Sequence, residues 1–328
     1  MLAYSVRRLL AAFPVLLAAS FVVFWVSSLL GDPVRNQYGG RTPPAPPALI
    51  AHEYARLHLR DGFFAQYWRW LTGMLAGDFG PSVQDDRIDI AADITGRLAV
   101  TLRLVVGAML IALVLALVTG VLSAVRRYSR LDHALTFVGF VFLAMPAFWI
   151  AVLLKQAAIA VNDLTATRPI ATIGERSVPA PDGAWNTVAD TFGHLLLPTL
   201  SLAAITYAAW SRFQRAAMLD VLNSDYIRLA RAKGLKPRQV LVKHALRTAL
   251  IPMTTASALT IATIFGGAVI TETVFQWQGM GKFLVQSVLT HDRNATMAWL
   301  VVAGTFVIVG NLIADLLYAV LDPRIRYG

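Results

Sequence analysis

The sequence has no cysteine and few charged residues. Only 15% of its 328 residues are Asp, Glu, Lys or Arg, whereas soluble domains carry about 25%. The missing thiols exclude disulfides, cysteine nucleophiles, iron–sulfur clusters and zinc sites built from cysteine. The shortage of charge, together with 57% hydrophobic residues, excludes a disordered chain and indicates one polytopic membrane protein.

Motifs for nucleotide, metal and covalent chemistry are also lacking. Gly281-Lys282 is followed by Phe283, and Gln276 stands where the first glycine of a P-loop would be, so the chain lacks that phosphate-binding motif. The six histidines are scattered and form no H-E-x-x-H pattern, and no serine–carboxylate nucleophile set is recognisable. We therefore expect no catalytic residue, no metal site and no cofactor bound by this chain itself.

Long apolar runs are what the sequence does have, and a spanning helix needs about 20 such residues. Candidate spans lie at 9–30, 101–122, 135–154, 195–210, 250–270 and 297–320. The sequence thus predicts an all-α membrane protein with six transmembrane helices. The first run is longer than a signal-peptide core, so we expect an uncleaved anchor. The predicted division is an anchor helix (1–30), an extracytoplasmic loop region (31–100) and a five-helix core (101–328).

The distribution of positive charge predicts the orientation in the membrane. With the N-terminus inside, the inner segments 1–8, 123–134, 211–249 and 321–328 carry 16 Lys and Arg residues, and the shorter outer loops carry five. Basic residues concentrate on the cytoplasmic side of membrane proteins. Both termini are therefore predicted to be cytoplasmic, and the net charge of +10 reflects this bias rather than nucleic-acid binding.

Two outer segments give less information. Residues 51–71 have helical spacing and many aromatic side chains, which suits either an interfacial helix with an aromatic belt or part of a docking face for an external partner. Residues 155–194 are polar and contain three prolines, and they predict no clear element.

The inner segment 211–249, which we call the basic inner loop, is the most informative part of the chain. Asn223-Ser224-Asp225 supplies candidate N-caps for a helix over Tyr226–Lys233. Gly234 then stands where a helix commonly ends, and Pro237 suits the start of a second helix. Nine basic residues and two acids allow the loop to lie on anionic lipid or to dock on a protein. A DNA-binding helix–turn–helix is disfavoured because both ends join the membrane.

A few polar residues fall inside or beside the spans. Asn311 and Asp315 are four residues apart, on one face of the last span. They could line a pathway or carry protons, or they could form a hydrogen-bonded pair inside the bundle. Arg103, Lys155 and Glu272 lie near span ends and are expected to reach the interface.

The basic inner loop also carries a family resemblance. Asp225-Tyr-Ile-Arg-Leu-Ala-Arg-Ala-Lys-Gly-Leu235, followed by Lys243-His-Ala-Leu-Arg-Thr-Ala-Leu-Ile-Pro252, resembles the EAA-type loop of ABC importer permeases. Glu272-Thr-Val-Phe-Gln-Trp-Gln-Gly-Met-Gly281 and Asp322-Pro-Arg-Ile-Arg-Tyr327 resemble further motifs of the dipeptide/oligopeptide/nickel branch, with Gln278 in place of a usual proline. The N-terminal start resembles the B-type permease of that branch.

The resemblance implies a type I ABC importer permease for peptides, located in the bacterial inner membrane. Its implied partners are a second, non-identical permease, two ATPase subunits or one fused ATPase, and an extracytoplasmic substrate-binding protein. ATP and Mg would be bound by the ATPases. The residues implied in coupling to the ATPases are Tyr226, Arg228, Ala230, Arg231, Ala232, Lys233, Gly234 and Leu235.

Two other classes of protein fit the sequence less well. An ion-coupled secondary transporter or a channel working without ATPases would favour two repeated halves and paired buried carboxylates. The sequence has one carboxylate deep in a span, Asp315, and no internal repeat. A membrane enzyme would need the catalytic cluster that the sequence lacks.

Overall fold

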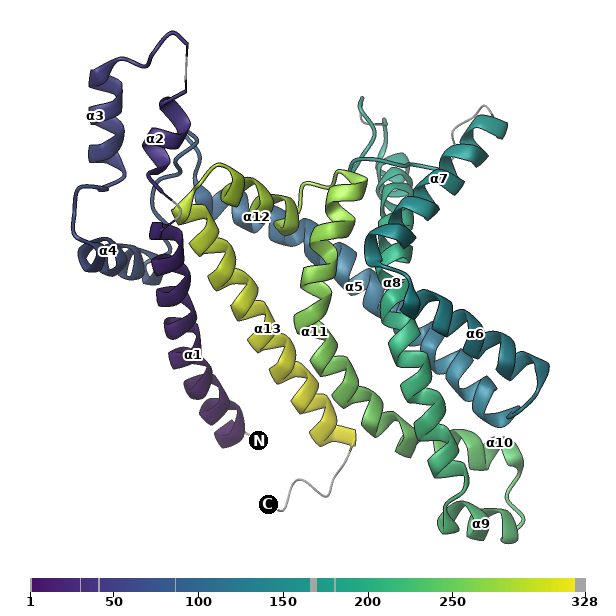
Figure 1. Ribbon diagram of the computed structural model, residues 1–328. Coiled ribbons are helices and arrows are strands. Elements are labelled where there is room, and N and C mark those ends of the chain that lie inside the picture. The colour runs from purple at the N-terminus through teal and green to yellow at the C-terminus, as the bar shows by residue number, and fades with distance from the viewer. Residues whose placement is uncertain are drawn as a thin grey trace. The chain divides into compact units, whose positions relative to one another are not determined.

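The computed structural model describes residues 2–29, 31–40, 42–85, 87–165, 170–179 and 181–321, and these residues form helices and connecting turns (Figure 1). In chain order, the first five helices of the described residues are α1 (Leu2–Leu29), α2 (Pro33–Tyr38), α3 (Pro47–Arg56), α4 (Phe63–Leu75) and α5 (Ile90–Val125). They are followed by α6 (Arg130–Ala144), α7 (Ala147–Thr165), α8 (Ala184–Leu222), α9 (Asp225–Ala232) and α10 (Pro237–Gln239). The π-helical segment η1 (Val240–Leu246) then leads to α11 (Arg247–Phe275), α12 (Met280–Leu289) and α13 (Arg293–Leu321).

Five helical segments of the described chain are long and apolar enough to cross a membrane. They are Leu10–Leu29, Ile90–Val125, Ala147–Thr165, Ala184–Leu222 and Arg293–Ile313. The predicted span 250–270 lies within α11, whose C-terminal part Ile264–Phe275 is apolar. Five of the six predicted spans therefore coincide with one continuous helix each.

The remaining predicted span, 135–154, is not one helix. The chain breaks between α6 and α7 at Met145, which has an extended conformation (ψ 134°) directly before Pro146. Proline disfavours helical geometry in the residue that precedes it and offers no N–H for the helix ladder. The prediction of a continuous helix here is wrong, because the helical run restarts at Ala147 as α7.

Two helices extend into the predicted outer loop 155–194, for which the sequence predicts no clear element. α7 continues to Thr165 and α8 begins at Ala184, so most of the predicted outer loop 155–194 is helical. At 1.5 Å per residue the 39 residues of α8 extend about 58 Å, nearly twice the thickness of the bilayer core. The ends of this helix must therefore stand outside the hydrocarbon.

The described residues form two compact units. One contains the described residues within 102–277 and 309–321, and the other contains those within 2–101 and 278–308. Segment 278–308 thus groups with the first hundred residues, which its place in the chain does not suggest. We call the first the core unit and the second the outer unit.

Small residues hold α5 close to α8 in the core unit. Ala108, Ala112 and Ala116, spaced four apart on one face of α5, are fully buried. They pack in one cluster with large side chains of α8, among them Tyr207 and Trp210. Small side chains let helix backbones approach closely in a membrane, so this alanine stripe allows α5 to pack against α8.

A buried ion pair joins the start of α6 to α8. The carboxylate of Asp132, which is 4% exposed, accepts hydrogen bonds from Arg215 Nε at 2.8 Å and Nη2 at 2.9 Å. It also accepts from the hydroxyl of Ser123 and from the backbone N–H of Tyr128. The Arg215 hydrogen bonds are the main cause that holds the pKa of Asp132 well below its usual range. Asp132 therefore remains an anion near neutral pH.

The aromatic residues of 51–71 belong to two helices of the outer unit. α3 ends at Arg56 and α4 starts at Phe63, with His58 in a left-handed conformation (φ 53°) between them. Phe63 and Tyr67 pack edge-to-face against Phe24 of α1, with ring centroids 5.4 and 5.3 Å apart. Part of the predicted aromatic belt is thus internal packing, whereas Phe64 remains exposed.

A buried carboxylate organises the turn before α13 in the same unit. Asp292 is completely buried and accepts hydrogen bonds from the Ser82 hydroxyl (2.5 Å), the Val83 N–H (3.0 Å) and the Ala295 N–H (3.1 Å). It therefore caps α13 and fixes the segment around Ser82 to that helix. Burial raises the pKa of Asp292.

Candidate functional site

The segment between α8 and α11, residues 223–246, contains most of the predicted site residues, and we call it the α9 loop. Ser224 adopts an extended conformation (φ −73°, ψ 152°) as the N-cap residue of α9. Its hydroxyl donates back to the carbonyl of Val221 at 2.6 Å rather than accepting from the helix. Asp225 occupies the first turn of α9, where the helix dipole favours a negative charge.

The end of α9 has the hydrogen bonds of a Schellman motif. The N–H of Gly234 donates to Arg231 O at 2.9 Å, and the N–H of Leu235 donates to Ala230 O at 3.4 Å. Gly234 has a φ of +78°, in the left-handed region that favours glycine. The sequence prediction of a helix that stops at Gly234 and restarts at Pro237 is confirmed.

One face of α9 is attached to the body of the core unit. Ile227 is fully buried and Ala230 is 8% exposed. Both belong to a cluster with Met218 of α8, Ala124 of α5 and Val240 and Ala245 of η1. Packed side chains therefore connect α9 to α5, α8 and η1.

The opposite face of α9 and the following turn are exposed. The large apolar side chains of Tyr226, Leu229 and Leu235 are 44%, 56% and 38% exposed. Exposed cations surround them: Arg228, Arg231, Lys233, Lys236 and Arg238. Within the loop Asp225 is the one carboxylate, and it pairs with Arg228. The result is a basic surface with an apolar centre, which suits a partner that offers carboxylates around an apolar cleft.

Seven of the eight residues predicted to couple to ATPases lie on this exposed surface. They are Tyr226, Arg228, Arg231, Ala232, Lys233, Gly234 and Leu235. The eighth, Ala230, belongs to the internal cluster instead, so its small side chain serves packing within the chain. The sequence analysis missed Leu229, which lies three residues after Tyr226 and is also exposed. Contact of these residues with an ATPase stays a prediction.

The predicted polar pair in the last span is described only in part. Asn311 is half-buried in α13, whereas the side chain of Asp315 lies outside the described part of the structure. The C-terminal motif 322–327 also lies outside it. Whether the two residues line a pathway or bond to each other remains an open prediction.

The motif at 272–281 forms the end of α11 and the start of α12. Gln276 has a left-handed conformation (φ 56°), and the Trp277 N–H closes the turn on Glu272 O at 2.8 Å. Lys155 Nζ donates to Val274 O at 2.9 Å and so joins α7 to this end of α11. Glu272 is fully buried, so the expectation that it reaches the interface is wrong. Among the described residues, no three His, Asp or Glu side chains are grouped so that they could hold a metal ion.

Comparison with known proteins identifies the family. The family described as "Binding-protein-dependent transport system inner membrane component" matches residues 98–327, and its N-terminal companion matches residues 1–85. The chain is 38% identical to the oligopeptide transport system permease protein AppB of Bacillus subtilis, over the full length of both. It is 38% identical to OppB of Mycobacterium tuberculosis over 98% of each chain. It is 33% identical to the dipeptide transport system permease protein DppB of Escherichia coli, covering 100% of this chain and 99% of that one.

A solved structure supports the fold. A chain of the MetNI methionine ABC transporter in an inward-facing conformation matches with a TM-score of 0.55 and 18% identity, covering 70% of this chain and 96% of that chain. At this identity the likeness concerns the fold alone. The matches over the full sequence show that the chain belongs to the binding-protein-dependent transport system inner membrane component family.

Proposed function

We propose that this chain is the transmembrane permease subunit of an ATP-driven importer of oligopeptides or dipeptides. The observation that carries the proposal is similarity over the whole chain to permeases named for oligopeptide and dipeptide transport. These relatives are described as permeases of transport systems, so the alternative of a secondary transporter or channel acting alone is not favoured. The chain forms half of the translocation pathway in the bacterial inner membrane.

In this proposal the membrane is crossed six times, by α1, α5, the α6–α7 pair, α8, α11 and α13. The positive charge of the inner segments places both termini in the cytoplasm. The α9 loop, which connects the fourth and fifth crossings, then also lies in the cytoplasm. Its Arg and Lys residues are consistent with that side.

The α9 loop couples the permease to ATP hydrolysis. Its exposed apolar centre, Tyr226, Leu229 and Leu235, is seated in a cleft of an ATPase subunit, and the surrounding cations pair with carboxylates at the rim. Closure of the ATPases around ATP moves α9, and the packing of Ile227 on Met218 and Val240 transmits that motion to α8 and α11. The pathway thus has two states, which are biased from the cytoplasmic side by nucleotide and from the outer side by substrate.

The remaining partners follow from the family. A second, non-identical permease supplies the other half of the pathway, and an extracytoplasmic binding protein delivers the peptide. Two ATPase subunits, or one fused ATPase, hold ATP and Mg. This chain holds neither and catalyses no reaction itself.

Copurification together with peptide uptake tests the proposal. The tagged chain is extracted in mild detergent and its companions are identified by mass spectrometry, while uptake of a labelled tripeptide is measured in cells with and without the gene. A second permease and P-loop ATPases should copurify, and deletion should abolish uptake. A chain that purifies alone, from cells whose peptide uptake survives deletion, would contradict the proposal.

A further inference from the structure

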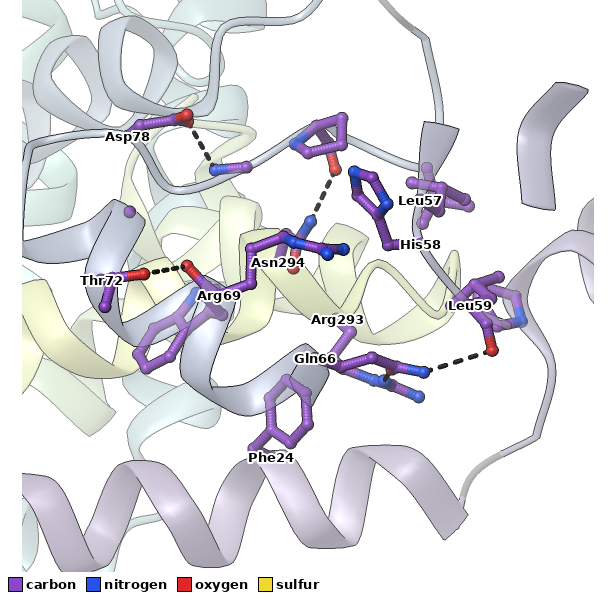
Figure 2. A pocket seen from close by; sticks show the side chains of 16 residues that line it. Phe24, Leu57, His58, Leu59, Gln66, Arg69, Thr72, Asp78, Arg293 and Asn294 are labelled. Carbon is purple, nitrogen blue, oxygen red and sulfur yellow. Dashed lines mark hydrogen bonds between the residues drawn. The ribbon is translucent and has the colours of Figure 1, made fainter. Parts of the chain in front are cut away.

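The outer unit contains a cavity of about 390 Å³ that the coupling mechanism does not use. Its volume lies within the range of roughly 300–1,000 Å³ that is typical of small-molecule sites. The wall is formed by α1, by the turn and helix from Leu57 to Gly73, by the loop from Asp78 to Val83, and by the start of α13. All of these segments belong to one compact unit, and Figure 2 shows their side chains converging on the cavity.

A guanidinium without a carboxylate partner lies at one side of the cavity. Arg293 is half-buried, and its Nη1 donates to the neutral Gln66 Oε1 at 2.7 Å. Its Cζ lies 5.0 Å from the centroid of the Phe24 ring. Among the described residues it forms no ion pair within 4.0 Å, and the nearby carboxylate of Asp32 already accepts hydrogen bonds from Val34, Arg35 and Tyr54. A partly desolvated cation favours an anionic ligand.

The other arginine of the wall is already neutralised. Arg69 Nη1 contacts the carboxylate of Asp61 at 2.6 Å. Gln66 is fully engaged as well, because its Nε2 donates to the carbonyls of Leu59 and Asp61. Among the described residues of the wall, Arg293 is therefore the arginine without an ion pair.

Acceptor groups lie elsewhere in the wall. One oxygen of Asp78 accepts from the Gly80 N–H at 2.8 Å, which leaves its second oxygen available to a ligand. Asn294 Nδ2 donates to Pro81 O at 2.9 Å and holds the loop against α13. Figure 2 shows Asp78 and Arg293 well separated in the view, with Arg69 and Asn294 between them. The cavity thus has an anionic end and a cationic end.

Apolar side chains cover much of the remaining wall. Phe24, Pro33, Leu57, Leu59, Trp70 and Val83 line the cavity. A ligand that fits has a carboxylate, a separate ammonium group and apolar side chains between them. We propose that this cavity binds a short zwitterionic peptide, with its α-carboxylate at Arg293 and its ammonium group at Asp78. This inference rests on the proposed function, and it adds a peptide site outside the membrane-crossing pathway.

Binding of end-blocked peptides tests the charge requirement. The complex that contains this chain, purified without binding protein and placed in nanodiscs, is titrated with trialanine, with its C-terminal amide and with its N-acetyl form by calorimetry. Trialanine should bind, and loss of either charged end should weaken binding at least tenfold. Failure of trialanine to bind, or equal binding of all three peptides, would overturn the proposal.

Substitutions locate the site. Arg293→Gln and Asp78→Asn should each reproduce the tenfold loss for trialanine, whereas Arg60→Gln, at an exposed arginine that does not line the cavity, should bind like the wild type. Wild-type binding by both cavity variants would refute the site even if peptide binds elsewhere in the complex. If one variant does not assemble, the other variant still tests the site, and the blocked peptides on the wild type still test the charge requirement. If cells still take up peptide while the purified complex fails these binding tests, the proposed cavity site is refuted and the proposed function is not.

Discussion

At the scale of single residues, Gly234 offers a clean test of the α9 loop. A Cβ built at this position would meet no atom within 4 Å, although its φ of +78° is strained for most residues by about 1–2 kcal/mol. Asp and Asn both tolerate this conformation and differ mainly in charge. We expect Gly234→Asp to insert normally and to lose at least tenfold in peptide uptake, because it brings an acid into the surface that we propose meets carboxylates of an ATPase.

The matched control for that change is Gly234→Asn. It makes the same demand on the backbone without the charge, so uptake should stay within a fewfold of the wild type. Membrane level by immunoblot and ATPase copurification are measured alongside. If Gly234→Asp takes up peptide and holds its ATPases as well as Gly234→Asn does, the loop is not the coupling element.

The Asp132–Arg215 pair predicts a pH dependence of stability. Arg215 lowers the pKa of Asp132 in the folded state, so the stabilisation is present above the unfolded value of about 3.9 and is lost as pH falls toward the folded value. Breaking a buried pair costs about 3–5 kcal/mol. Because Arg215 is 28% exposed, we expect Asp132→Asn to lose about 2–3 kcal/mol.

Thermal unfolding of the purified chain in detergent measures this effect. As the pH falls from about 5 to about 2, the wild type should lose more of its Tm than Asp132→Asn does, since the variant has no carboxylate left to protonate. Asp225→Asn serves as the control, because its pair with Arg228 is exposed on both sides and such pairs contribute little. Parallel Tm profiles for wild type and Asp132→Asn would show that the pair does not stabilise the fold.

At the scale of helices, two glycines of α5 should respond in opposite ways to the same change. A Cβ at Gly120 would lie 2.8 Å from Gln214 Cβ and 3.0 Å from Ser211 O, so α5 and α8 would have to separate. A Cβ at Gly96 would meet nothing within 4 Å. Gly120→Ala should lower the unfolding temperature, and Gly96→Ala should leave it unchanged or raise it, because alanine favours the helix by about 1 kcal/mol. Equal Tm values would contradict the close approach of the two helices.

The elements that local signals specify were predictable from the sequence. The α9 helix, its stop at Gly234 and its restart at Pro237 follow from a left-handed glycine and an N-terminal proline. The rules for proline also predict the break at Met145, but the apolar run 135–154 is continuous and favours a single span. The burial of Ala230 could not be predicted from the sequence, because it depends on the packing of Val240 and Met218 from other helices. The cavity in the outer unit could not be predicted either, since Arg293 and Phe24 are brought together only by the fold.

At the scale of the whole molecule, the absence of native cysteine makes the orientation directly measurable. Single cysteines can be placed at exposed sites without a cysteine-free background being engineered first. Val178 is 92% exposed, in a segment predicted to lie outside, and Lys236 is exposed in the α9 loop. Arg60, which is exposed between α3 and α4, reports on the outer unit.

A membrane-impermeant maleimide then distinguishes the two faces of the membrane. With both termini inside, Val178→Cys and Arg60→Cys should label in cells whose inner membrane is intact, and Lys236→Cys should label only after that membrane is permeabilised. The reverse pattern would place the α9 loop outside, away from any ATPase, and would refute both the orientation and the coupling role. Between these two positions α8 alone is expected to carry the chain across the membrane, so they should lie on opposite faces. Labelling of Val178→Cys and Lys236→Cys from the same side would therefore show that α8 does not cross the membrane once between them.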